Sequence, residues 1–154
     1  MLDKMANMGE NFFVVKDTKE RVFGGYTDKA FDGFGGWKTG NKKSFLYSFK
    51  DEDTIIKCEC LKQENEIYGG TDSEPIVMGY NGGIDFYIKD RCESGDINYS
   101  VLGNGFQKND LPNDSLAGEK YFTVKELEIF RVKNQDWILF LSFLKQKISY
   151  NKFR

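Results

Sequence analysis

The chain has 154 residues and a net charge of −2, with 22 basic and 24 acidic side chains. This length suits one domain with a substantial core, and the balanced charge excludes a global basic field for nucleic acid or anionic lipid. Histidine is absent, which excludes Ser-His-Asp and Cys-His catalysis within the chain and removes the commonest metal ligand.

The cysteines and the first residues bear on the compartment. The cysteine count is odd, with Cys58, Cys60 and Cys92. Residues 1–10 are polar and lack the apolar stretch of a secretory signal. We therefore expect a reducing, intracellular location, cytoplasmic or attached to the cytoskeleton or an organelle. No apolar run reaches about 18 residues, so we expect no transmembrane segment.

The chain opens with the pattern of a helix end and continues as a β domain. In residues 1–9, three apolar side chains at three-residue spacing precede Gly9, as in a helix that ends at a C′ glycine. Residues 10–133 consist of short apolar runs separated by glycine-rich or charged turns, with no βαβ rhythm. This pattern predicts a mainly β fold, α+β only at its margins: a sandwich of two antiparallel sheets with a few short helices.

Two runs near the start predict a hairpin. Residues 11–16 are apolar on both faces, which predicts an internal strand. Residues 21–27 return as its partner, and Gly24 and Gly25 mark a bulge or a crossing point. Residues 44–49 predict a further strand with an aromatic side chain at every second position on one face.

Segment 75–90 has three closely spaced glycines before an apolar run. Gly79, Gly82 and Gly83 permit a positive φ or a very close backbone approach. The apolar run that follows is too short for a globular helix and predicts a buried strand. We interpret the segment as a bend that leads into a strand at a crossing point of the sandwich.

The longest apolar run and the tail come last. Residues 121–132 predict one long strand. Residues 134–154 predict an apolar, helical tail with Asp136 as a candidate N-cap. Whether the tail folds back on the sandwich or docks on a partner stays open. Its candidate docking side chains are Trp137, Phe140, Leu141, Leu144 and Ile148.

Glu126 and Glu128 are the strongest candidates for chemistry. At i and i+2 they share a strand face with Val124 and Phe130, about 7 Å apart, a separation compatible with a pair of glycosidase carboxylates. No third acidic side chain follows at that spacing. The alternative is that each carboxylate bonds to the backbone or to a basic side chain, and we favour this alternative because a buried charge must be paired.

Other candidate sites are weaker. Cys58 and Cys60, with Cys92, would supply three thiolates for zinc or a redox-responsive thiol, but small buried side chains explain them as well. We expect no metal and no cofactor. Four aromatic side chains could stack on nucleic-acid bases: Phe34, Trp37, Tyr80 and Tyr87. The slightly acidic net charge of the chain favours core packing for them instead.

Four segments in order resemble the TLDc domain, the module of oxidation-resistance proteins and of several vacuolar-ATPase regulators. The sequences of these segments are most similar to divergent forms common in single-celled eukaryotes. The matching segments are 12–17 running into Val22-Phe23-Gly24-Gly25-Tyr26, 40–49 with Ser44-Phe45-Leu46-Tyr47-Ser48-Phe49, 78–88 with Gly82-Gly83 and Asp85-Phe86-Tyr87-Ile88, and Leu116-Ala117-Gly118 with 124–132.

The resemblance implies a two-sheet sandwich without established enzymatic activity. It further implies a role in oxidative-stress resistance and binding to large assemblies, notably the proton-pumping V-ATPase, rather than to nucleic acid. The glycines expected to define the fold are Gly24, Gly25, Gly79, Gly82, Gly83 and Gly118.

The chain also departs from the family pattern. Met78-Gly79-Tyr80 stands where Phe-Gly-Gly is typical, most members end near Val132, and a helix and a strand usually precede the point where this chain begins. These departures keep two alternatives open. One is a permanent structural subunit of a cytoskeletal, ciliary or organellar assembly, and the other is a glycoside hydrolase that uses Glu126 and Glu128.

Overall fold

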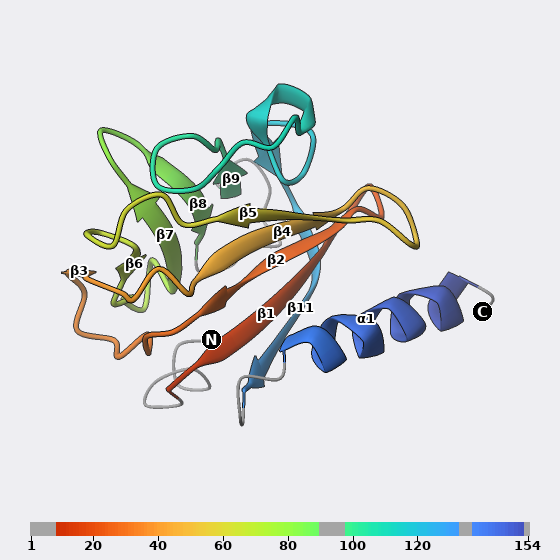
Figure 1. The fold of residues 1–154 in the computed structure, drawn as a ribbon, viewed down its shortest axis with the longest axis horizontal. Coiled ribbons are helices and arrows are strands. Elements are labelled where there is room, and N and C mark those ends of the chain that lie inside the picture. The colour runs from red at the N-terminus through yellow and green to blue at the C-terminus, as the bar shows by residue number, and fades with distance from the viewer. Residues whose placement is uncertain (1–8, 90–97, 133–136, 153–154) are drawn as a thin grey trace.

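The computed structural model describes residues 9–89, 98–132 and 137–152. Two antiparallel sheets pack face to face, and one α-helix lies at the end of the chain (Figure 1). The predicted β-sandwich is therefore confirmed. The predicted helix end before Gly9 lies outside the described residues.

The first sheet has the strand order β11-β1-β2-β4-β5. Its strands are β1 (Asn11–Asp17), β2 (Val22–Thr27), β4 (Phe45–Phe49), β5 (Ile55–Glu59) and β11 (Val124–Arg131). Strand β1 pairs with β2 on one side and with β11 on the other, which confirms the prediction of an internal strand.

The second sheet has the order β10-β9-β8-β7-β6-β3. Its strands are β3 (Trp37–Lys38), β6 (Ile67–Tyr68), β7 (Ile76–Tyr80), β8 (Ile84–Ile88), β9 (Asn98–Ser100) and β10 (Tyr121–Phe122). A short 3-10 helix, η3 (Pro112–Asp114), precedes β10.

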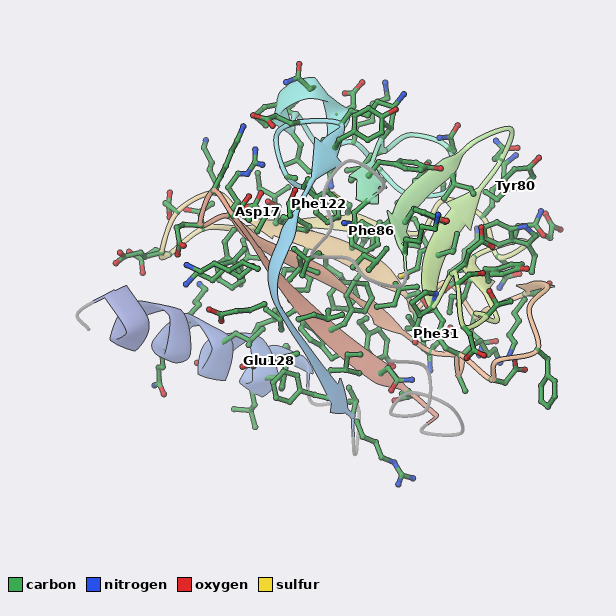
Figure 2. All side chains as sticks on the ribbon, turned by 180° about the vertical axis from the view of Figure 1, so that it is seen from behind. Asp17, Phe31, Tyr80, Phe86, Phe122 and Glu128 are labelled. Atoms are coloured by element: carbon green, nitrogen blue, oxygen red, sulfur yellow. The ribbon has the colours of Figure 1, made fainter. Side chains whose placement is uncertain are left out.

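The main core fills the space between the sheets. Phe13 of the first sheet stacks on Phe86 of the second at a centroid distance of 5.5 Å, and Phe86 stacks in turn on Phe122 at 5.9 Å (Figure 2). All three side chains are buried. Burial of such aromatic surface from both inner faces is the main force that holds the two sheets together.

A second apolar cluster covers the outer face of the first sheet. Phe12, Tyr26, Phe45 and Tyr47 are buried there by α1 (Trp137–Lys152), which contributes Leu144. Because alternate residues of a strand point to opposite faces, the apolar alternation of β1 and β4 supplies both this cluster and the main core.

Two predicted elements were wrong. Segment 75–90 is not a bend before one strand, because residues 76–80 form β7, which makes a hairpin with β8. Residues 121–132 are not one strand, because the chain passes at Thr123 from β10 in the second sheet to β11 in the first. Apolar periodicity alone does not show to which sheet each half of a run belongs.

Gly24 and Gly25 lie in β2 where other backbone and side chains come closest. A Cβ at Gly24 would lie 2.0 Å from the carbonyl oxygen of Phe13 and 2.7 Å from the hydroxyl of Tyr47. A Cβ at Gly25 would lie 2.7 Å from the Phe13 ring. The pairing of β2 with β1 is regular along both residues, so they mark a close approach rather than a bulge.

The other glycines singled out from the sequence have varied surroundings. Gly79 has a φ of 74°, and an added Cβ would lie 2.8 Å from Phe106. Gly82 and Gly118 also have positive φ, but a Cβ at Gly82 would meet no atom within 4 Å, so this residue serves the turn and not a crossing. The atoms nearest to a Cβ at Gly83 would belong to the side chain of Asn104, at 3.1 Å.

Glycine has two roles here: it allows a close approach of neighbouring atoms at Gly24, and it allows a left-handed turn at Gly82. Replacing each residue by alanine separates the two roles. We expect Gly24→Ala to lower the free energy of unfolding by about 3 kcal/mol or more, because the methyl group overlaps a backbone oxygen. The matched variant Gly82→Ala should lower it by only about 1–2 kcal/mol, the cost of a left-handed conformation in open space. Urea unfolding measures both changes, and equal losses would contradict the close-approach role.

Candidate functional site

Helix α1 covers the apolar outer face of the first sheet. Phe140 of α1 packs edge-to-face on Phe12 at 4.3 Å and on Phe130 at 4.9 Å, measured between ring centroids. Leu141 and the buried Leu144 extend the contact. The structure therefore places these three candidate docking residues against the sandwich.

The first turn of the same helix exposes apolar side chains on its other side, where the exposed Ser142 and Gln146 follow. The side chains of Ile138 and Leu139 are each 66% exposed. Trp137 and Ile148 belong to α1, but their side chains lie outside the described ones. In the described part of the chain, no helix is both long and apolar enough to cross a membrane. The exposed pair gives α1 an apolar surface directed away from the sheet.

Glu126 and Glu128 lie on β11, an edge strand of the first sheet. The β1–β11 pairing shifts register between Lys16 and Asp17, so Val124 packs in the main core instead of sharing their face, as the sequence pattern predicted. Glu126 has a 53% exposed side chain whose oxygen lies 4.0 Å from the Lys16 ammonium. Neither of the two grooves described on the protein surface includes them in its lining.

Other acidic side chains are buried, and the sequence pattern did not single them out. Asp85 accepts hydrogen bonds from three successive backbone N–H groups, those of Asn104, Gly105 and Phe106, at 2.6–3.0 Å. Burial raises the pKa of Asp85. This carboxylate fixes the loop after β9 against the second sheet, and such loop pins leave no acceptor directed at a substrate.

Glu66 has the same role nearby, and its backbone oxygen accepts the Gly79 N–H at 2.9 Å. It is 1% exposed, and its two carboxylate oxygens accept N–H groups of Ser44 at 3.1 Å and Lys42 at 3.3 Å. Burial raises the pKa of the Glu66 carboxyl, and nearby Asp28 adds to the effect. Glu66 thereby fixes the start of β4 to β6.

The thiols lie in surroundings that oppose reactivity. Burial raises the pKa of both Cys58 and Cys60 to about 12, so both are thiols at neutral pH. Cys92 lies outside the described residues. Within the described ranges, no cluster of three or more acidic, cysteine or histidine side chains is placed to hold a metal ion.

An aromatic edge is exposed where core packing was predicted. Phe34 is 90% exposed and Tyr80 41%, so the prediction was wrong for both. The Phe34 N–H donates to Asp32 Oδ1, and the flanking Gly33 and Gly35 donate to the backbone of 69–70 at 2.9 Å. The loop around Phe34 is therefore fixed, and it presents this side chain to solvent.

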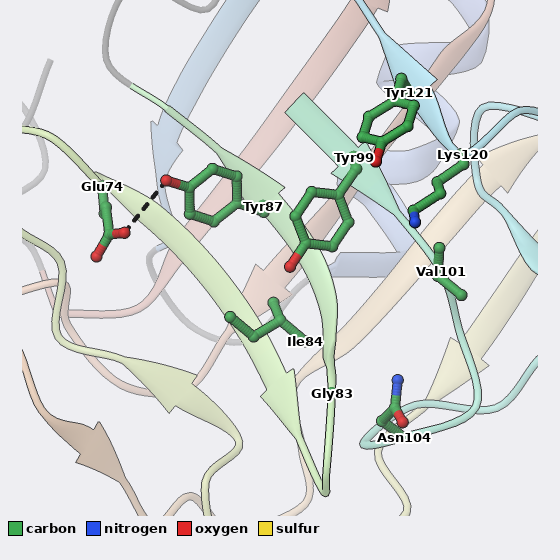
Figure 3. A pocket seen from close by; sticks show the side chains of 9 residues that line it. All are labelled: Glu74, Gly83, Ile84, Tyr87, Tyr99, Val101, Asn104, Lys120 and Tyr121. Carbon is green, nitrogen blue, oxygen red and sulfur yellow. Dashed lines mark hydrogen bonds between the residues drawn. The ribbon is translucent and has the colours of Figure 1, made fainter. Parts of the chain in front are cut away.

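A groove crosses the outer face of the second sheet. It has a volume of about 900 Å³, and its lining includes one tyrosine from each of three neighbouring strands, with Glu74 near one end and Lys120 near the other (Figure 3). Tyr87 pairs with Tyr99 across β8 and β9, and Tyr99 pairs with Tyr121 across β9 and β10. The sequence pattern missed this row because its members come from strands whose register is set only in the folded sheet.

The buried Glu66 predicts a specific dependence of stability on pH. Because its folded pKa is raised above the ordinary value of 4.5, its contribution to stability is full below about pH 4.5 and is lost as pH rises through the folded pKa. The stability of the natural chain relative to Glu66→Gln should therefore fall as pH rises above 4.5. Urea unfolding of both proteins from pH 4 to pH 8 measures this difference, and a difference that stays constant or rises would contradict it.

The family comparison agrees with this architecture. No curated protein matches the chain. The profile of the TLDc domain matches residues 1–133, which include the eleven strands of the described ranges and end before α1. Since the match spans most of the 154 residues, the chain belongs to the TLDc domain family.

Proposed function

We propose that this chain is a non-catalytic protein-interaction module that attaches to a large protein assembly through α1. The single observation that carries the proposal is that α1 packs on the sandwich and still exposes two apolar side chains in its first turn. One side, with Phe140 and Leu144, packs on the sandwich, and the other exposes Ile138 and Leu139. Exposed apolar side chains on a fixed helix are typical of a surface that a partner covers.

The chemistry of the described residues supports a role without catalysis. The buried carboxylates of Asp85 and Glu66 accept backbone N–H groups, and the thiols of Cys58 and Cys60 are held protonated by burial. A general base or a nucleophile needs an available lone pair near its working pH. None of these four groups meets that requirement.

The resemblance stated above supplies the assembly to test first. We propose the V-ATPase as the partner, with a role in oxidative-stress resistance, in the cytoplasm. A second candidate is a permanent structural subunit of a cytoskeletal or ciliary assembly. The position of α1 favours it, because the helix follows the residues matched by the family and provides an additional apolar surface.

Charging the outer side of α1 tests both candidates. We expect the double variant Ile138→Glu with Leu139→Glu to reduce recovery of the assembly at least about tenfold, because a buried carboxylate without a partner opposes association. Leu61→Glu is the matched control, since Leu61 is 43% exposed on a different element and should change nothing. The measurement is quantitative mass spectrometry after affinity purification of the full chain, with V-ATPase subunits and cytoskeletal proteins counted separately.

The rate of exchange distinguishes the two candidates. A regulated module exchanges with free labelled chain within minutes, whereas a permanent subunit does not exchange. Unchanged recovery with the charged helix, while thermal unfolding remains normal, would overturn the docking role of α1.

A further inference from the structure

The groove of the second sheet lies on the face opposite the main core, away from the apolar face that α1 covers. Tyr87, Tyr99 and Tyr121 form its central row. The first two rings are stacked at a centroid distance of 5.4 Å, and the third meets Tyr99 edge-on at 6.4 Å. Tyrosines packed on one another lose little freedom when a ligand arrives, so the row is a preorganised surface.

The spacing of the row fits one kind of extended chain. Tyr87 and Tyr121 lie two strands apart, which places them roughly 10 Å from each other. A polyproline II helix repeats every three residues over about 9 Å. Side chains at i and i+3 of such a helix would therefore meet the two outer tyrosines in the same way. An extended β-strand repeats every two residues over about 7 Å and does not match this interval.

The hydrogen-bonding groups of the groove suit the same ligand. Burial raises the pKa of Tyr87 to about 12 and that of Tyr99 above its ordinary value, so both hydroxyls stay protonated. The Tyr87 hydroxyl donates to Glu74, and the Tyr99 hydroxyl can donate to a ligand. Polyproline II backbone has free carbonyl acceptors and, at proline, no N–H that must be satisfied. Tyrosine hydroxyls beside apolar ring faces thus complement it.

Two opposite charges flank the tyrosines. The Glu74 carboxylate accepts the Tyr87 hydroxyl at 3.2 Å, and the Lys120 ammonium lies 5.1 Å from the centre of the Tyr121 ring. Figure 3 shows Glu74 beyond one end of the row and Lys120 beside the other. A ligand with a basic residue at one end and an acidic residue at the other would pair with both charges.

We propose that this groove binds a proline-rich segment of another protein in the polyproline II conformation, with a basic residue at Glu74 and an acidic residue at Lys120. The two prolines among the 154 residues, Pro75 and Pro112, are far apart in the sequence and do not form a proline-rich segment. The aromatic row supplies the contact area, and the flanking charges select the ends.

Binding of three labelled peptides to the full chain tests the proposal by fluorescence anisotropy. The first has a proline-rich core with one arginine end and one aspartate end. The second has the same core with aspartate at both ends, and the third has the charges of the first on a glycine-serine core. We expect the natural chain to bind the first at least about tenfold more tightly than the other two. Equal binding of the glycine-serine peptide, or no binding of the first up to about 1 mM, would overturn the proposal.

Variants assign the binding to the groove. Tyr121→Ala should weaken binding of the first peptide at least about tenfold, since aromatic anchors dominate such interfaces. Tyr80→Ala is the matched control, because Tyr80 is 41% exposed, close to the 50% of Tyr121, but lies outside the groove. Glu74→Lys should reverse the preference in favour of the peptide with two aspartates. If Tyr121→Ala or Glu74→Lys leaves the affinity for the peptides unchanged while thermal unfolding is normal, the peptide binds elsewhere and the site is refuted.

Discussion

The close approach of β2 to its neighbours at Gly24 and Gly25 is the constraint on which the rest of the first sheet depends. Without side chains there, Tyr47 of β4 reaches across β2, and its hydroxyl donates to the carbonyl of Phe13 in β1 at 3.1 Å. On the inner face, the Phe13 ring lies over Gly25 and meets the second sheet at Phe86. Two aromatic side chains thus cross the same strand on opposite faces. Both faces of the sheet become apolar as a result, and an apolar outer face requires a cover.

The outer faces of the two sheets differ in their contact with water. The first sheet is covered by α1, through edge-to-face contacts of Phe140 and the buried Leu144. The second carries the row of tyrosines, whose apolar rings and polar hydroxyls tolerate both water and a ligand. The interaction surfaces that we infer therefore lie on opposite sides of the sandwich. One chain would accordingly be able to contact an assembly through α1 and a flexible, proline-rich segment through the groove.

Charged groups in the interior hold loops rather than perform chemistry. Asp17 accepts the backbone N–H groups of Lys19 and Arg21 and pairs with the Arg21 guanidinium, which closes the β1–β2 turn. Asp85 and Glu66 do the same for longer connections. A buried carboxylate costs free energy unless donors surround it, and backbone N–H groups are the donors that a strand-and-loop protein has in excess. The loop around Phe34 is fixed in a similar way, because the Phe34 N–H donates to the Asp32 carboxylate.

The local period of apolar side chains was sufficient to predict the fold class, the internal position of residues 11–16 and the alternation of residues 44–49. The sequence also pointed to Gly24 and Gly25, because paired glycines in an apolar run indicate close packing. Only the tertiary structure decided that the run 121–132 divides between the sheets, that Val124 leaves the face of Glu126, and that Tyr87, Tyr99 and Tyr121 share one groove. Register shifts, strand order and crossings between sheets are set by contacts between residues far apart in the chain. A period read along the sequence carries no information about them.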